Sequence, residues 1–184
     1  MHTTFPQLLL NHARQRPNAA ALREKEYGIW QTTTWRELLQ EVEYLACGLH
    51  QAGLHRGEHL IVVGTNRPRL YATMLAAQSL GAIPIPLYQD AVAAECVFPI
   101  NNADVRFAVV EDQEQVDKML EVREQSPQLQ HIFFDDPRGL RNYTEDGLGS
   151  LDELLAAGQV FAQQHPQFFH TEAEKAVPAD VAAM

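Results

Sequence analysis

The chain has 184 residues, of which 46% are hydrophobic, and a formal net charge of −10 at pH 7. This length can bury a core of ordinary single-domain size, while the acidity disfavours a nucleic-acid partner. With no apolar run long enough to span a bilayer and no secretory signal at the N-terminus, the sequence predicts a soluble cytoplasmic protein.

The first elements along the chain are predicted by apolar spacing and by turn signals. Residues 5–13 place Phe, Leu and Ala on one helical face, and Pro17 closes this helix. Two strands are expected over residues 20–23 and 29–33, with a turn near Tyr27-Gly28. Together they predict a helix followed by a hairpin.

Two pairs of residues carry the pattern of a helix-opening capping box. Thr34 and Glu37 begin a helix that Gly53 ends, and Ser150 and Glu153 begin another helix near the C-terminus. In each pair the two side chains satisfy each other's backbone amides, so both helix starts are predicted from local chemistry alone.

Strand and helix patterns alternate through the middle of the chain. Continuous apolar runs predict strands at residues 60–63, 83–87, 105–110 and 131–134. Pro84 and Pro86 indicate that the second of these is an edge or irregular strand, because proline cannot donate to a ladder. The helices between them are expected to begin near Asn66, which can act as a cap, near Ala91, with Pro99 limiting or kinking that helix, and after the cap Asp112.

This alternation predicts an α/β fold, a mostly parallel doubly wound sheet with flanking helices. From His165 to Pro178 no periodicity is visible, so a surface excursion is expected there. Pro178 to Met184 has the pattern of a turn and the first residues of a buried strand. We therefore expect residues 1–164 to form an N-terminal α/β subdomain and 165–184 a connecting segment with the start of a further strand, as in the front part of a larger enzyme.

Two turns near predicted strand ends are candidate binding sites. The turn Gly64–Arg69 could hold an anion with its amides and two arginines, but it lacks the glycine spacing of a phosphate loop, so a capped helix start is favoured. Glu111 and Asp112 come after another strand, where open α/β sheets place ligands. Here too a structural role is favoured: Asp112 with Gln115 forms a capping pair, and Glu111 suits the helix dipole.

The histidines and cysteines give weaker signals. His55 and His59 have the spacing of a helical metal site, but the intervening Gly57 and the following strand favour a solvated turn. Cys47 and Cys96 lie far apart on predicted apolar helix faces, which favours small buried thiols. The sequence also contains no nucleophile elbow and no Walker-type phosphate loop.

Residues 34–38 (Thr-Trp-Arg-Glu-Leu) and residues 74–87, where a helix is expected to end in glycine before a short proline-containing strand, carry a recognisable resemblance. They are similar to the first and second core motifs of the adenylate-forming enzymes, the superfamily of acyl-CoA synthetases, peptide-synthetase adenylation domains and luciferases. Residues 8–20 match the usual start of these enzymes. Residues 87–91 and 109–118 most resemble bacterial long-chain or aromatic acyl-CoA ligases, so the likeness covers nearly the whole chain.

The resemblance implies an ATP-dependent ligase that converts a carboxylic acid, ATP and CoA to acyl-CoA, AMP and pyrophosphate through an acyl-adenylate. In the family, a strand like Asp180-Val181-Ala182 leads into a Thr/Ser/Gly-rich phosphate loop, which does not occur here. We therefore expect no catalytic, cofactor-binding or metal-binding residue and no cofactor in this chain. ATP, Mg²⁺ and CoA are implied only for the full-length parent.

Three hypotheses about function are compatible with the sequence. The first is the N-terminal portion of an acyl-CoA ligase, inactive alone and marginally stable or self-associating, with residues 165–184 mobile and 58–134 best ordered. The second is a non-catalytic interaction module that associates with the remainder of the enzyme or with another copy of itself. A flavodoxin-like ligand binder is disfavoured, because no phosphate-binding turn comes after the first sheet strand.

Overall fold

A five-stranded parallel sheet forms the centre of the computed structural model, which describes residues 4–184. Its strand order is β4-β3-β5-β6-β7, and every neighbouring pair is parallel. The strands are β3 (His59–Val63), β4 (Ile83–Leu87), β5 (Phe107–Val110), β6 (His131–Phe134) and β7 (Leu148–Ser150). The predicted α/β class with a parallel sheet is confirmed.

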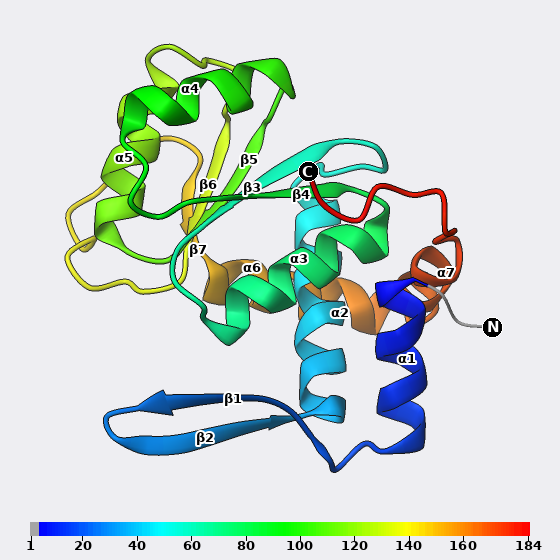
Figure 1. Cartoon of the computed structure of the whole chain (residues 1–184). Coiled ribbons are helices and arrows are strands. Elements are labelled where there is room, and N and C mark those ends of the chain that lie inside the picture. Colours follow the sequence, from blue (N-terminus) through cyan, green and yellow to red (C-terminus); the bar gives the residue numbers. More distant parts are fainter. Residues whose placement is uncertain (1–3) are drawn as a thin grey trace.

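Helices cover both faces of this sheet (Figure 1). The helices within residues 4–184 are α1 (Phe5–Gln15), α2 (Trp35–Gln51), α3 (Pro68–Leu80), α4 (Ala93–Asn102), α5 (Gln113–Arg123), α6 (Leu151–Gln164) and α7 (Phe168–Glu174). Side chains of α4 and α5 share one buried cluster with the sheet, and side chains of α2, α3 and α6 share a second cluster with its other face. Helices crossing between parallel strands explain the doubly wound arrangement.

The strands β3 and β5 are buried on both faces, as their continuous apolar sequences predict. In β3, Leu60 and Val62 belong to the cluster with α2 and α3, whereas Ile61 and Val63 belong to the cluster with α4 and α5. The alternation of side chains along a strand places successive residues on opposite faces. A strand that is central in the sheet and covered on both sides therefore needs apolar residues at every position.

The hairpin of β1 (Ala20–Glu26) and β2 (Ile29–Thr34) is antiparallel and separate from the central sheet. Tyr27 and Gly28 both have positive φ, +47° and +82°, at the predicted turn. Two such residues match the twist of a two-residue hairpin loop, which explains the glycine. Figure 1 shows the hairpin extending away from the sheet beside the foot of α2.

The edge position predicted for residues 83–87 is confirmed, because β4 has only β3 as a neighbour. The amide of Ile83 donates to Glu58 on the β3 side. Along a strand, the backbone groups of successive residues point alternately to the two sides. The backbone groups of Ile83 point toward β3, so those of Pro84 and Pro86 point toward the free edge. That edge lacks two amide donors, which discourages uncontrolled strand pairing.

The structure corrects three expectations and adds one strand that the sequence did not predict. Residues 165–178 contain α7, whose Phe169 and Ala173 are buried, where a surface excursion without helix was expected. Residues 181–184 form no strand and are exposed, lying beside the edge strand β4. The strand β7 was missed, because its three residues Leu-Gly-Ser carry little β signal. Asn66 does not cap α3; its side-chain oxygen accepts from the Tyr71 hydroxyl, and Arg67 holds the cap position.

Within residues 4–184, no helix has the length and apolar character that crossing a membrane requires.

Candidate functional site

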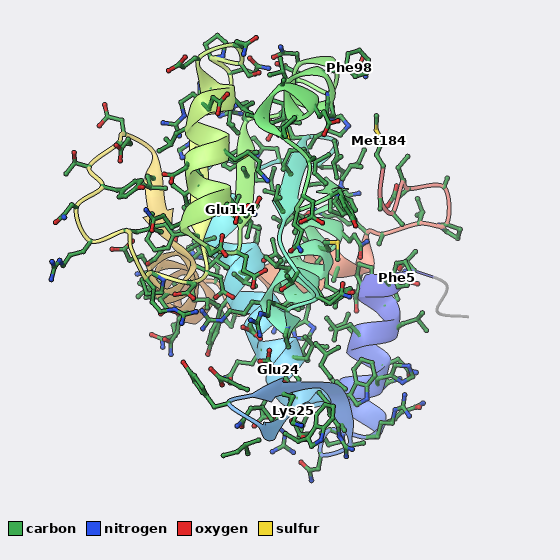
Figure 2. The ribbon with its side chains drawn as sticks, turned by 60° about the vertical axis from the view of Figure 1, so that its left-hand side comes forward. Phe5, Glu24, Lys25, Phe98, Glu114 and Met184 are labelled. Atoms are coloured by element: carbon green, nitrogen blue, oxygen red, sulfur yellow. The ribbon has the colours of Figure 1, made fainter. Side chains whose placement is uncertain are left out.

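The carboxyl edge of the parallel sheet gathers the charged residues that come after successive strands. The turn Gly64–Arg69 comes after β3, Glu111 after β5 and Asp135 after β6. Neighbouring parallel strands end at the same edge, so residues far apart in sequence meet there, and this is where open α/β sheets place ligands. The hairpin lies beneath this edge, with Glu24 and Lys25 labelled in Figure 2.

Glu111 is the centre of one hydrogen-bonded group at this edge. Its carboxylate accepts from the backbone amide of Thr65, from the Thr65 hydroxyl at 2.7 Å and from Arg67 Nε at 2.9 Å. Burial opposes ionisation, but these hydrogen bonds and the nearby guanidinium outweigh it, so the pKa of Glu111 is lowered. Arg67 also lies 3.6 Å from Glu24 of the hairpin. The turn therefore already holds an anion, a carboxylate of the chain itself.

Arg69 is the centre of a second group. Its guanidinium contacts Asp152 of α6 at 2.8 Å, Asp135 after β6 at 3.0 Å and Glu41 of α2 at 3.3 Å. Burial raises the pKa of Glu41 and of Asp135, although Arg69 acts in the opposite direction on both. Arg69 of α3 thus joins three carboxylates, one on α2, one on α6 and one in the loop after β6.

A hollow of about 600 Å³ lies between the hairpin and this edge. Acidic and basic side chains from both elements line it together with two prolines and a tyrosine: Glu24, Lys25, Glu26, Tyr27, Arg67, Pro68, Arg69, Glu111, Asp135, Asp136, Pro137 and Arg138. Arg138 pairs with Asp136. A triphosphate placed against Arg67 and Arg69 would meet the carboxylates that already neutralise them. The residues present do not fit such a group, and an anion site in this turn is not supported.

Glu111 and Asp112, the two residues of the second candidate turn, have different roles. Asp112 accepts from the amide of Gln115 at 3.2 Å and begins α5, so its predicted capping role is confirmed. The sequence predicts that Glu111 interacts with the helix dipole, whereas in the structure Thr65 and Arg67 donate hydrogen bonds to its carboxylate. Sequence reasoning missed this contact because 46 residues separate Glu111 from Thr65 and no local pattern links them.

The remaining candidates occupy structural positions. His55 lies in the turn before Gly57, and His59 begins β3, so the two do not share a helix. In the part of the chain that the structure describes, no three His, Cys, Asp or Glu side chains are grouped to hold a metal ion. Cys47 and Cys96 are both buried free thiols, and burial raises the pKa of Cys47 to about 12. A thiol with so high a pKa is a poor nucleophile at neutral pH.

An apolar groove of about 460 Å³ runs along α1, α3 and the base of the hairpin. Its lining is almost entirely apolar or aromatic: Phe5, Leu8, Leu9, His12, Ala21, Leu22, Trp35, Leu38, Tyr71, Met74, Leu75 and Gln78. Phe5 is 55% exposed and Tyr71 is 41% exposed. Large side chains of this kind on an open surface lose the stabilisation that burial would give them.

The amino-acid sequence of this chain is similar to that of a known enzyme family and of several known proteins. Residues 9–184 match the model of the AMP-binding enzyme family. The chain is 31% identical over 130 residues to the uncharacterized protein Rv1549 of Mycobacterium tuberculosis, an alignment that covers 71% of each chain. It is 25% identical over 130 residues, 71% of this chain, to the long-chain-fatty-acid–CoA ligase ACSBG2 of Xenopus laevis.

Solved structures show the same fold. The chain superimposes on the anthranilate CoA ligase AuaEII, solved in complex with anthranoyl-AMP, with a TM-score of 0.73 and 18% identity over 84% of this chain. It spans only 28% of that ligase and 18% of ACSBG2. The likeness to these ligases therefore concerns one part of each.

Proposed function

We propose, since this chain belongs to the AMP-binding enzyme family, that it supplies the N-terminal α/β subdomain of an ATP-dependent acyl-CoA ligase. In this proposal residues 1–164 form the subdomain, and residues 165–184 connect it to the later parts of the larger enzymes. The observation that carries the proposal is the family match over residues 9–184, supported by relatives described as long-chain-fatty-acid–CoA ligases.

The reaction proposed for the full-length parent has two steps. A carboxylate attacks the α-phosphorus of ATP and releases pyrophosphate, and the thiol of CoA then displaces AMP from the acyl-adenylate. Charge builds up on the leaving pyrophosphate, so the first step needs amide donors, a cation and Mg²⁺ placed together. ATP, Mg²⁺ and CoA are thus the cofactors and cosubstrates proposed for the parent, with a carboxylic acid as substrate.

We further propose that these 184 residues do not catalyse adenylation by themselves. The arginines nearest the carboxyl edge of the sheet are held by carboxylates: Arg67 by Glu111 and Glu24, and Arg69 by Asp135, Asp152 and Glu41. Binding a polyphosphate there would first require breaking these ion pairs. Their role in this proposal is to fix the orientation of the hairpin, α2 and α6 around the sheet.

The test is carboxylate-dependent exchange of labelled pyrophosphate into ATP. The purified 184-residue chain is incubated with Mg²⁺, ATP and a panel of fatty and aromatic acids, and a full-length acyl-CoA ligase serves as the positive control. We expect no exchange above the blank without acid. Exchange that depends on the acid would overturn the proposed inactivity while supporting the ligase assignment.

A second candidate is a non-catalytic module that associates with another polypeptide through the apolar groove. Its exposed Phe5 and Tyr71 line a surface that a partner could cover. Sedimentation at several protein concentrations tests self-association: a mass that stays monomeric throughout excludes it over that range. Sedimentation of Tyr71→Ser separates an assembly made through the groove from one made through another surface.

A further inference from the structure

Three histidines and two phenylalanines meet where the C-terminal ends of α2 and α6 approach the start of α7. The ring centroid of His50 lies 4.5 Å from that of Phe168 and 5.7 Å from that of Phe161. His165 stacks on Phe161 at 4.2 Å, and His55 lies 5.9 Å from His50. We call these five residues the histidine cluster.

This cluster lies at the point where the C-terminal segment 165–184 joins the body of the molecule. Phe169 and Ala173 of α7 are buried in the core that α2 and α3 share. Because Phe168 is the first residue of α7 and contacts both His50 and Phe161, its ring connects the helix to the ends of α2 and α6. The packing of α7 against the body of the molecule therefore depends on whether the imidazole rings around Phe168 are neutral or protonated.

Beyond α7 the segment runs along α3 to the edge of the sheet. Asp180 lies 3.5 Å from Arg56, and the carbonyl of Ala182 accepts from Gln78 Nε2 at 2.6 Å. The amide of Met184 donates to the carbonyl of Pro84 on β4 at 3.2 Å. Figure 2 shows Met184 and Phe5 on the same side of the molecule. Of the residues after α7 only Ala176 is buried, and the contacts of Asp180, Ala182 and Met184 are polar, so α7 and Ala176 supply the apolar anchor of the segment.

Burial and two neighbouring imidazoles oppose the protonation of His50 in the docked state, whereas a carboxylate of α7 favours it. Burial lowers the pKa of His50 most, and charge on His55 lowers it further; Glu172 of α7 raises it, and His165 lowers it again. Glu172 is itself paired with Lys175 at 2.5 Å. Three imidazoles that share one cluster repel one another when they are protonated.

We propose that protonation of His50 makes the histidine cluster a pH-sensitive latch, which in mild acid releases α7 and the segment 165–184 from α3 and β4. Phe168 packs on His50 at 4.5 Å only while α7 is docked, and this burial lowers the pKa of His50 in the docked state, so the released state takes up more protons. Docking is therefore fully stable above the ordinary pKa of about 6.5 and weakens as the pH falls below it. Release uncovers the outward carbonyl of Pro84 and the end of the apolar groove at Phe5 and Gln78.

Hydrogen exchange of the whole chain at about pH 7.5 and about pH 5.5 tests the latch. The protection factors of α7 amides such as Thr171, corrected for intrinsic exchange rates, should fall in acid. For each proton taken up on release, these protection factors should fall by up to about tenfold per pH unit. The amide of Val109 in β5 should keep its protection. Equal loss in β5 and α7 would indicate global unfolding and overturn the latch.

A matched pair of variants isolates the imidazole responsible. His50→Gln should lose most of the acid-dependent exchange of α7, whereas His59→Gln, at the start of β3 and outside the cluster, should retain it. Equal pH dependence in His50→Gln and the unsubstituted chain contradicts the proposal. If His50→Gln fails to fold, NMR titration of the native chain decides. A His50 midpoint below about 6.5 that coincides with shifts of α7 amides supports the latch, and any other midpoint or no coincidence overturns it.

Discussion

On one face of the sheet α4 and α5 form a single layer, whereas α2, α3 and α6 cover the other face with α1 and α7 packed against them (Figure 1). The single layer is held by side chains such as Ile100, Met119 and Ile132, all fully buried. The five helices on the other face, which we call the double layer, are also held by close contact between the backbones of α2 and α6. A β-carbon added at Gly158 of α6 would lie 1.8 Å from the carbonyl oxygen of Tyr44 in α2.

This difference separates two ways of stabilising one fold. Side chains can shift to absorb a change in volume, whereas two helix backbones in contact cannot move apart without disturbing every residue between them. We therefore expect the double layer to tolerate substitution less well. It also positions α7 and the histidine cluster, so the proposed pH response belongs to the less tolerant face.

The largest effect should come from removing a buried side chain of the double layer. Leu45→Ala in α2 should cost about 4–5 kcal/mol of unfolding free energy, because surrounding helices restrict collapse into the cavity. Met119→Ala in α5 should cost about 2–3 kcal/mol, since the single layer can relax toward the sheet. Urea unfolding of both variants measures the difference. Equal losses of unfolding free energy in the two variants would contradict the proposed difference between the two faces.

Gly158→Ala should be the next most damaging change. Its added methyl group meets a backbone carbonyl, so we expect a loss of about 3 kcal/mol, at the upper end of the usual range for overpacking. For a chain of this size that corresponds to a fall in Tm of roughly 6–12 °C by calorimetry. Gln159→Ala, exposed on the same helix, is the control and should leave Tm nearly unchanged. A stable Gly158→Ala variant would refute backbone contact between α2 and α6.

The stabilisation that a helix cap provides should not depend on which face of the sheet its helix covers. The Ser150 hydroxyl accepts from the amide of Glu153 at 3.1 Å at the start of α6, and Asp112 caps α5. Ser150→Ala and Asp112→Ala should each cost about 1 kcal/mol, because each leaves one orphan amide at a helix start. Chemical denaturation should give similar values for both. A much larger cost for Ser150 would mean that its helix start contributes to the α2–α6 contact.

The smallest effect is expected at the hairpin, which belongs to neither layer. Glu24 and Arg67 lie 3.6 Å apart, with 30% and 45% of their side chains exposed. Glu24→Gln should cost only about 0.2–1 kcal/mol, as is usual for surface ion pairs. The cost should shrink further in about 1 M salt, where the Debye length is near 3 Å. A cost that is unchanged by salt would show that Glu24 acts through packing.

Local signals in the sequence determined most elements of the structure. The capping pairs Thr34–Glu37 and Ser150–Glu153 hold as hydrogen bonds in the structure, because each lies within one turn of chain. Likewise, the apolar runs at β3 and β5 predicted strands covered on both faces, and the two prolines of β4 predicted an edge strand. The motifs of residues 34–38 and 74–87 also identified the family over nearly the whole chain.

Only the tertiary structure decided which residues meet across long separations. Glu111 binds Thr65 and Arg67 because β5 is the neighbour of β3, an order that no local pattern specifies. The helix α7 has no side-chain cap and depends on burying Phe169 and Ala173 against helices from elsewhere in the chain. Caps and periodicity act between residues a few positions apart. Burial and ion pairing depend on which elements become neighbours, and the whole fold sets that.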